Sequence, residues 1–376
     1  MFYNFLFLTA ILFGSLGFGS DQKELVQNHK NEREYYGKKQ PSEPFEQGMP
    51  LPCGKYPCAY NAPAAICLKN AWDFNIFGSF IYWYASQDDM DIAWSSVQVS
   101  LDPAASLGSR VAHQNFKYEP GFKVGFGFNT DYDNWVFRAE YTWLHESVST
   151  GAIEDPTLPN GTPVNWETNH WFQLTDSSLT SIASTWKLKL DMLDAVMQRP
   201  FYQGTKLTVT PFGGLRALWL RQKFTLTGID DIAPATRIST NRSNSWALGP
   251  VTGVGGHWLL GGGFRFEGNA LASLLYTRYT KIWNSDEPLP NRIFKSSWKN
   301  VGAVRPAAQL NLGLGWGRYF HGCNRDCYLD ISIDYEFLEF WSQNMMRNFV
   351  ESLGGFSGDI GDLQIHGLTA TARFDF

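Results

Sequence analysis

The chain has 376 residues, a formal net charge of -5, 18% charged residues and 16% aromatic residues. The absence of a basic stripe argues against a nucleic-acid partner, and a mean hydropathy of -0.26 excludes a bundle of membrane-spanning helices. Moderate hydropathy with many aromatic residues is typical of a transmembrane β-barrel, because only every second strand residue faces lipid.

The N-terminal part predicts two segments before the barrel. Residues 1–19 predict a signal peptide, in which an apolar stretch ends at Gly17-Phe18-Gly19. No Lys or Arg precedes that stretch, so an uncleaved anchor helix is the alternative. Residues 20–70 predict a flexible periplasmic segment that contains three cysteines, because residues 21–47 hold too few apolar side chains to order themselves. The barrel is expected over residues 71–376.

Strict alternation of apolar and polar residues predicts antiparallel strands from Trp72 onward. Phe122, Val124 and Phe126, for example, alternate with Lys123 and Gly125. Ten strands are predicted, over residues 72–84, 116–128, 135–145, 184–196, 207–220, 246–256, 264–281, 308–320, 328–341 and 363–376. Two further strands over 92–101 and 168–175 would give twelve, which is the alternative count.

The predicted connections alternate between long and short along the chain. This asymmetry is typical of an all-β, up-and-down outer-membrane barrel with long outer loops and short periplasmic turns. It places both termini in the periplasm. The long loops expected to face outward contain Asp88, Pro159, Asp230, Asp286 and Gly354.

The C-terminal residues predict the closing strand of the barrel and its assembly signal. Leu368, Ala370, Ala372, Phe374 and Phe376 alternate with polar residues or glycine, and the chain ends on an aromatic side chain. A terminal strand that ends in Phe is the usual signal for the barrel-assembly machinery. Its free edge is expected to pair with the first strand, since a membrane barrel must close to satisfy its backbone.

These strand motifs carry a resemblance to a known family. The segment Phe122–Phe128, the tract Asp131–Trp143 and the ending Phe374-Asp375-Phe376 resemble the Legionella-type major outer membrane proteins, which also occur in chlamydia-like bacteria. The likeness covers most of residues 70–376. The resemblance implies a pore-forming, abundant surface barrel that is sometimes cross-linked by disulfides. The loops show no match, so surface-specific roles do not transfer.

The polar faces of the predicted strands supply candidate pore-lining residues. Their charges either filter solutes by charge or form a salt-bridged plug, since a barrel of about ten strands has little free lumen. Both alternatives stay open. The candidates are Lys117, Glu119, Lys123, Arg138, Glu140, Lys187, Lys189, Asp191, Arg265, Glu267, Asp330, Asp334, Glu336, Arg373 and Asp375.

Enzymatic and cofactor sites have weaker support in the sequence. An outer-membrane protease would need carboxylates and a His at the outer rim, where His113, His145 and His170 lie in or near loops with Asp88 and Asp89, but no Asp-x-His pair occurs. No Gly-x-Ser-x-Gly motif indicates a phospholipase. Glycines at 253–256 and 261–263 lack the Lys and helix of a phosphate loop, and they predict lumen-facing positions and a turn. We expect no catalytic site and no cofactor.

The five cysteines all fall on the predicted periplasmic side. Cys53, Cys58 and Cys67 precede the first strand, and Cys323 and Cys327 fall in a short turn. Their spacing would also suit zinc, but an oxidising compartment favours disulfides, with Cys323 and Cys327 as one pair. An odd thiol then remains for a second copy or a Cys-rich envelope protein, unless it is simply free and unreactive.

The function expected from the sequence is passive diffusion of small hydrophilic solutes through an abundant outer-membrane barrel, surrounded by outer-membrane lipid. A structural or adhesive surface barrel with a closed lumen is the alternative. A barrel enzyme, such as a protease, is the weaker third class.

Overall fold

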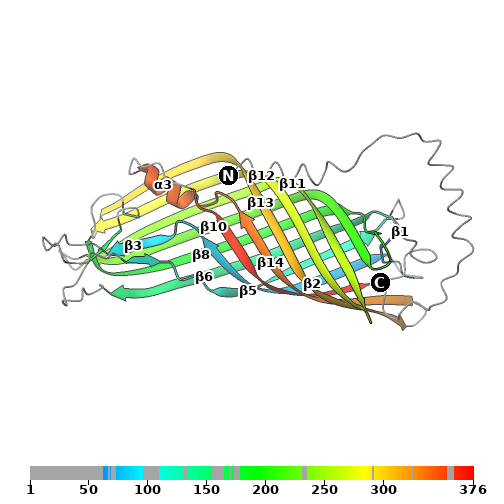
Figure 1. Cartoon of the computed structure of the whole chain (residues 1–376). Helices are drawn as coiled ribbons and strands as arrows, with labels where there is room; N and C mark the ends of the chain where they lie inside the picture. The colour runs from blue at the N-terminus through cyan, green and yellow to red at the C-terminus, as the bar shows by residue number, and fades with distance from the viewer. Residues whose placement is uncertain are drawn as a thin grey trace, which may run out of the picture. The chain divides into compact units, whose positions relative to one another are not determined.

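The structure is a computed structural model that describes residues 62–66, 68, 73–95, 110–130, 134–154, 165–168, 171–172, 178–230, 235–289, 292–322, 325–353 and 360–376. Ten long antiparallel strands form a barrel within these residues (Figure 1). They are β2 (Phe74–Gln87), β5 (Tyr118–Asn129), β6 (Val136–Glu154), β8 (Ser178–Gln198), β10 (Leu207–Asp230), β11 (Thr236–Gly261), β12 (Phe264–Leu289), β13 (Arg292–Gly322), β14 (Arg325–Phe340) and β15 (Leu363–Asp375).

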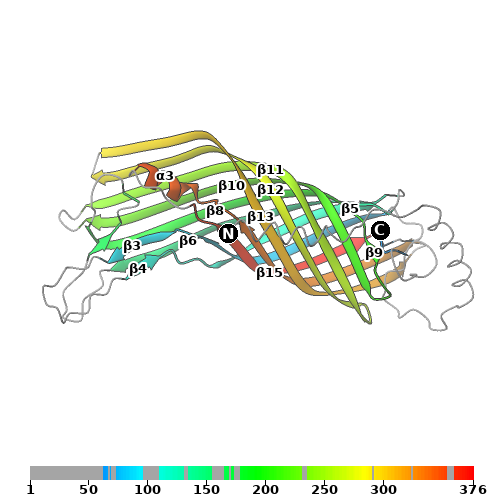
Figure 2. The same ribbon diagram turned by 45° about the horizontal axis from the view of Figure 1, so that its top comes forward.

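The barrel closes where the last strand meets the first. β15 pairs with β2 from Leu363 and Gln87 to Asp375 and Asn75. Between these two strands each long strand pairs with the next one along the chain, and β8 pairs directly with β10 (Figure 2). The ten predicted strands are therefore confirmed. Closure satisfies the backbone hydrogen bonds of every wall strand, as a hydrocarbon environment requires.

The twelve-strand alternative is wrong. Within the described residues, the candidate segment 92–101 overlaps β3 (Asp91–Ser95), and the candidate segment 168–175 contains no strand, because β7 (Trp166–Glu167) ends just before it. Together with β4 (Val111–His113), β3 and β7 make a short sheet that attaches to the first residues of β8. These short strands pair at the outer rim rather than entering the wall.

Two of the long loops expected from the sequence are largely strand. β10 continues to Asp230 and β11 begins at Thr236, while β12 ends at Leu289 and β13 begins at Arg292. The inward faces of these extensions mix apolar side chains such as Phe224 with polar ones such as Ser239 and Asn241, so the hydrophobic alternation is weaker there. β12 and β13 are 26 and 31 residues long, whereas a tilted strand of about 9–11 residues crosses a bilayer. The wall therefore extends well beyond the membrane.

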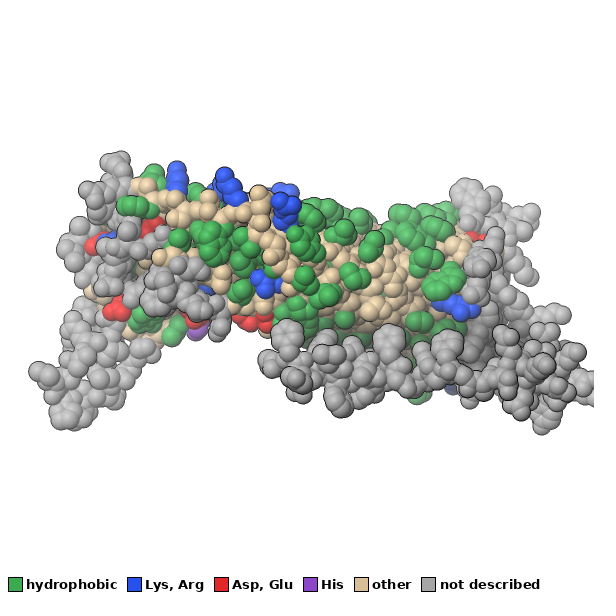
Figure 3. Space-filling model, turned by 90° about the horizontal axis from the view of Figure 1, so that it is seen from above, with side chains coloured by type: hydrophobic (Ala, Val, Ile, Leu, Met, Phe, Trp, Pro, Cys, Tyr) green, Lys and Arg blue, Asp and Glu red, His purple; other side chains and the backbone are tan. Residues whose placement is uncertain are grey.

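The polarity of the two faces reverses along the wall. In the part of β8 nearer the short turns, which we call the inner half of the barrel, Leu193 and Met197 are exposed on the outside. In the outer half, nearer the loops, Leu188 is fully buried inside while Lys187 and Lys189 are exposed outside. Figure 3 shows hydrophobic side chains gathered over one half of the visible wall and most Lys and Arg side chains over the other. The outward surface of the inner half therefore suits contact with lipid, and the outward surface of the outer half suits contact with water.

Loop segments fill the outer opening of the barrel. Helix α3 (Met345–Leu353) contacts β11 and β12 and places Met346 and Val350 in the main hydrophobic core. Trp171 from the β7–β8 connection is fully buried in the same core. No helix within the described residues is long and apolar enough to cross a membrane.

Candidate functional site

The barrel interior is the candidate site, and most of the predicted lumen residues point into it. Alternation along each strand, together with the buried neighbours, fixes the inward direction. The predicted residues that face the interior are Glu119, Lys123, Arg138, Glu140, Arg265, Glu267, Asp330, Asp334, Glu336, Arg373 and Asp375. This placement gives their direction only; whether solutes pass them stays a prediction.

Four predicted lumen residues are elsewhere. Lys187, Lys189 and Asp191 face outward on β8, because Trp186, Leu188 and Leu190 occupy the inward positions. Lys117 precedes β5 and is exposed. The prediction assumed that the apolar face of each strand meets lipid, and this rule fails in the outer half, where the apolar face forms the core.

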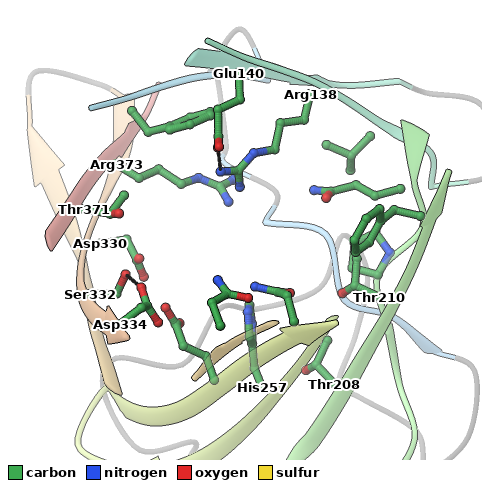
Figure 4. A pocket seen from close by; sticks show the side chains of 18 of the residues that line it. Arg138, Glu140, Thr208, Thr210, His257, Asp330, Ser332, Asp334, Thr371 and Arg373 are labelled. Carbon is green, nitrogen blue, oxygen red and sulfur yellow. Dashed lines mark hydrogen bonds and ion pairs between the residues drawn. The ribbon is translucent and has the colours of Figure 1, made fainter. Parts of the chain in front are cut away.

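A polar cavity of about 270 Å³ occupies the inner half of the barrel. Figure 4 shows Arg138, Arg373, Asp330 and Asp334 pointing into this open space. Glycines on β13 make room for the large side chains, since a Cβ on Gly315 would lie 2.5 Å from the guanidinium carbon of Arg265. The glycine-rich face predicted from the sequence therefore serves to accommodate arginine.

The N-terminal residues that are described line the periplasmic end of this cavity. β1 (Ala62–Pro63) pairs with β9 (Phe201–Tyr202), and the Ala64 amide donates to the Pro200 carbonyl at 3.1 Å. The side-chain amide of Asn129 donates to the Ile66 carbonyl at 2.6 Å. Residues 64–66 thus lie across the cavity rather than hanging free, although the segment was expected to be flexible.

A belt of hydrogen-bonded charges crosses the interior, and most of its residues line the cavity. Lys123 donates to both carboxylate oxygens of Glu336, at 2.9 and 2.7 Å. Glu336 accepts from Gln309, whose carbonyl oxygen accepts from Arg216 at 2.8 Å. Arg216 also binds Asp194 through two hydrogen bonds of 2.7 Å. We call the set Lys123, Arg138, Glu140, Asp194, Arg216, Gln309 and Glu336 the charged belt; Arg138 and Glu140 join it through Lys123. Asp194, Arg216 and Gln309 were not among the predicted residues.

A second charged network lies nearer the short turns. Arg265 binds Asp330 through two guanidinium nitrogens and Glu267 through its Nε at 2.6 Å. Arg373 makes a bidentate pair with Asp375, at 2.9 and 2.6 Å. Both guanidinium groups are balanced by carboxylates, which a buried charge requires. The two networks cross-link the wall and leave the 270 Å³ cavity between them polar.

A hydrophobic core fills the interior of the outer half. The side chain of Trp83 lies at the boundary, where the Lys123 ammonium sits 4.9 Å from its ring centroid. Beyond it, Leu144, Leu188 and Phe224 from three different strands are fully buried. The rest of the core comes from the other strands and from the loop segments described above. This interior resembles the packed core of a soluble protein more than a water-filled channel.

The core also contains a buried acidic residue. Glu146 follows Leu144 on the inward face of β6, its exposed fraction is 6%, and neither carboxylate oxygen has a hydrogen-bond partner among the described residues. A buried polar group without a partner destabilises the folded state. Sequence alternation could have placed Glu146 inside, but the apolar character of its surroundings was not visible.

The His residues at the outer end give no grouped catalytic site within the described residues. His113 Nδ1 lies 2.6 Å from Asp91 in the exposed rim sheet, and His145 Nε2 lies 3.2 Å from Asp191 on the outside of the wall. Asp88 lies at the end of β2, where burial and the neighbouring Asp362 carboxylate raise its pKa. His170 lies outside the described residues. No described cluster of three or more His, Cys, Asp or Glu side chains could hold a metal ion.

The glycine segments behave as predicted except at Gly256, which shares the outward face of Val254 and Trp258. Gly261, Gly262 and Gly263 all have positive φ and form the turn between β11 and β12. Gly253 and Gly255 occupy inward positions on β11, where Thr252 and Val254 face outward.

Of the five cysteines, the structure describes Cys327 alone, and its thiol is free. It lies within β14, opposite Phe320, rather than in the turn where it was predicted. Cys53, Cys58, Cys67 and Cys323 lie outside the described residues, as does the predicted signal peptide over residues 1–19. Disulfide pairing therefore stays a prediction.

Comparisons with known proteins agree with the barrel. The sequence matches the family described as Legionella pneumophila major outer membrane protein precursor over residues 62–376. No curated protein matches it. Among solved structures, the outer membrane protease OmpT from Escherichia coli is 11% identical, with a TM-score of 0.36 over 82% of this chain and 97% of that chain. A Pseudomonas aeruginosa FadL homologue is 8% identical, with a TM-score of 0.26 over 88% and 96%.

Those structural likenesses are too low to carry an argument about activity. The family match, in contrast, covers the whole barrel from β1 to the last residue. The chain belongs to the Legionella major outer membrane protein family, and it is a β-barrel of the bacterial outer membrane.

Proposed function

We propose that this protein is an abundant structural barrel of the outer membrane that displays its outer half at the cell surface and keeps its lumen closed in the resting state. The observation that carries the proposal is the hydrophobic core of the outer half. Solutes that entered the polar cavity would meet Trp83, Leu188 and Phe224, none of which has measurable exposure.

The free energy needed to expose that core argues against spontaneous opening of the lumen. Exposing one buried Leu, Phe or Trp costs about 1.5–3 kcal/mol, so exposing four such side chains costs on the order of 6–12 kcal/mol. At the lower figure, about one molecule in 10⁴ would be open at any moment. The charged belt adds hydrogen bonds that must also break.

A small-solute porin is the second candidate, and a specific observation favours it. The membrane-embedded half encloses a polar cavity lined by both signs of charge, as a filter for hydrophilic solutes would be. The family resemblance seen in the sequence also implies pore formation. Under this proposal, residues 64–66 and the loop that carries Trp171 would have to move to connect the cavity to both sides.

Planar-bilayer recording of the purified protein separates the two candidates. We expect no steady conductance from the wild-type barrel at low voltage, and clear conductance from a Trp171→Ala/Phe224→Ala variant in which the core is cut back. The variant serves as the control for successful reconstitution. Steady steps from the wild-type protein would overturn the closed barrel and establish the porin.

A further inference from the structure

Outward-facing cations form rows across the outer half of one wall. In the first row, Lys189 on β8 pairs with Arg221 on β10, which pairs with Asn244 on β11. Asn244 pairs with Lys281 on β12, which pairs with Lys299 on β13. Because the barrel pairs these strands side by side, cations that are far apart in the sequence become neighbours.

A second row lies directly beyond the first. Lys187 pairs with Lys223, Lys223 pairs with Arg242, and Arg242 pairs with Trp283. We call the cations of both rows the cation band: Lys187, Lys189, Arg221, Lys223, Arg242, Lys281 and Lys299. All of them are exposed except Lys223, which is half-buried.

Acidic side chains in the described part of the chain do not pair with the cations of the band. Like charges directly opposite each other on neighbouring strands are destabilising, yet Lys187 faces Lys223 and Lys281 faces Lys299. None of the seven cations forms an ion pair with a described carboxylate. A folded protein that keeps such repulsion at its surface gains stability when an anion binds there.

The position of the band relative to the membrane indicates which anion. One row closer to the short turns, Trp219 pairs with Trp246 on the outside of the wall, and Trp143 follows on β6 beyond Asp191. A row of indole rings marks the interface between hydrocarbon and headgroups in outer-membrane barrels. Below it, exposed Leu215 and Leu248 face the acyl chains. The cations therefore lie at the level of the headgroups of the outer leaflet.

The centre of the band has a notch that fits a headgroup anion. Arg242, Asn244, Lys281 and Trp283 line a small cavity of about 100 Å³. The Arg242 guanidinium and the Lys281 ammonium lie 5.1 and 5.6 Å from the Trp283 ring centroid. The notch thus offers two cations, an amide and an aromatic surface within one site. Arg and Lys are the side chains that bind phosphate oxygens.

We propose that the cation band binds the phosphate groups of phosphorylated lipids in the outer leaflet, with the notch at Arg242 and Lys281 as its centre. The band is confined to the wall from β8 to β13. At the outer edge of the opposite wall, Ser86, Gln364 and Glu339 pair in a row that carries no cation. The barrel therefore recruits phosphorylated lipid on one side.

The test compares Arg242→Gln/Lys281→Gln with a matched control, Lys206→Gln/Arg318→Gln. The control removes one exposed Lys and one exposed Arg at the opposite end of the same wall. Each protein is reconstituted in phosphatidylcholine and titrated with bisphosphorylated lipid A, and its Tm is followed by the heat-dependent shift in gel mobility. We expect lipid A to raise the Tm of the wild-type protein and of the control by about 2–5 °C.

The Arg242→Gln/Lys281→Gln variant has a distinctive expected result. In phosphatidylcholine alone its Tm should equal or exceed that of the wild-type protein, because repulsion is relieved. With lipid A it should gain less than half of the wild-type shift, and ~1 M NaCl should abolish the shift for all proteins. The conservative variant Arg242→Lys/Lys281→Arg should keep the shift.

Several results would overturn the proposal. They are no Tm shift for the wild-type protein, the same shift in both Gln variants, or the same shift with lipid A from which the phosphates have been removed. An equal shift with inorganic phosphate would mean that the site takes free phosphate and not lipid. Native mass spectrometry of retained lipid supplies a second measurement: the Arg242→Gln/Lys281→Gln barrel should retain less lipid A than the control.

Discussion

The Lys123 ammonium on β5 lies 2.7 Å from Glu336 Oε2 on β14, and β15 and β2 separate the two strands in the sheet. The contact therefore crosses part of the lumen instead of following the wall. Both side chains are almost completely buried, at 5% and 3% exposure. Removing one partner leaves the other as an uncompensated buried charge.

Lys123→Met should consequently lower the free energy of unfolding by about 3–5 kcal/mol. The double variant Lys123→Met/Glu336→Met should recover most of that loss, because no unpaired charge remains. Denaturant unfolding of the refolded barrel measures the free energy of unfolding of both variants. Lys206→Met, at an exposed position, is the control, and its free energy of unfolding should stay within about 0.5 kcal/mol of the wild-type value. Equal losses for the single and double variants would show that the pair itself, and not the orphaned charge, dominates.

Trp171 ties a loop to the core. Its ring centroid lies 4.6 Å from that of Phe224, and its indole N–H donates to the Asp91 carbonyl at 2.6 Å. Trp171→Ala should cost about 3–5 kcal/mol of stability, and it should make the β7–β8 loop susceptible to protease before the wall unfolds. Trp258→Ala, at an outward position with 58% exposure, is the control and should lose less stability than Trp171→Ala. Unchanged proteolysis would mean that the loop is held by other contacts.

Replacing Glu146 with an apolar residue should raise the free energy of unfolding. Its carboxylate is buried without a hydrogen-bond partner in the described structure. Glu146→Leu removes that desolvated group and should raise the free energy of unfolding by about 1–3 kcal/mol. The same denaturant experiment measures it. A loss of stability would reveal a partner, such as a bound water or cation, that stabilises the carboxylate.

The terminal residue should matter for assembly. Phe376 exchanges backbone hydrogen bonds with Phe74 at 3.0 and 3.3 Å, and their rings lie 5.6 Å apart. Phe376→Lys should therefore leave protein in the periplasm and reduce the amount in the outer membrane. Phe320→Lys, an outward Phe near the end of β13, is the matched control and should still assemble. Fractionation of cells measures both, and normal insertion of Phe376→Lys would show that the assembly signal lies elsewhere.

A separate prediction concerns disulfide bonds between copies of the protein. Cys327 lies near the periplasmic end of β14 and its thiol is free in the structure, and the other four cysteines lie outside the described residues. We expect disulfide-linked oligomers on non-reducing electrophoresis of alkylated membranes, which collapse to monomer on reduction. A single monomer band with and without reductant would remove the cross-linking hypothesis.

The sequence predicted the wall better than the interior. Strands such as Tyr118–Asn129 were predictable because their outward Phe and Val residues alternate with small or charged ones over the lipid-facing half. The extensions after Leu220 and Tyr279 were missed, since their inward faces mix apolar residues such as Phe224 with polar residues such as Asn284, which weakens the alternation. Lys187 and Lys189 were assigned to the wrong face for a related reason, because the interior of the outer half is apolar.

The sequence could not predict which residues of the charged belt contact one another. Lys123, Glu336 and Arg216 could each be placed on an inward face, but which of them meet depends on how the strands are staggered around the closed barrel. No local pattern encodes that stagger. Gln309 was missed for another reason: an uncharged amide gives no signal until its two ion-pair neighbours are known.

The reversed polarity of the wall has a consequence for how the protein reaches its final location. The strands that carry Lys187, Arg221 and Lys281 must pass through the hydrocarbon before their tips reach the cell exterior. A Lys or Arg at the bilayer midplane costs about 2–4 kcal/mol, so carrying the seven cations across together would cost on the order of 10–30 kcal/mol. Spontaneous insertion into a plain lipid bilayer should therefore be slow, and we expect biogenesis of this barrel to require an assembly machinery that thins or opens the membrane while the hairpins cross.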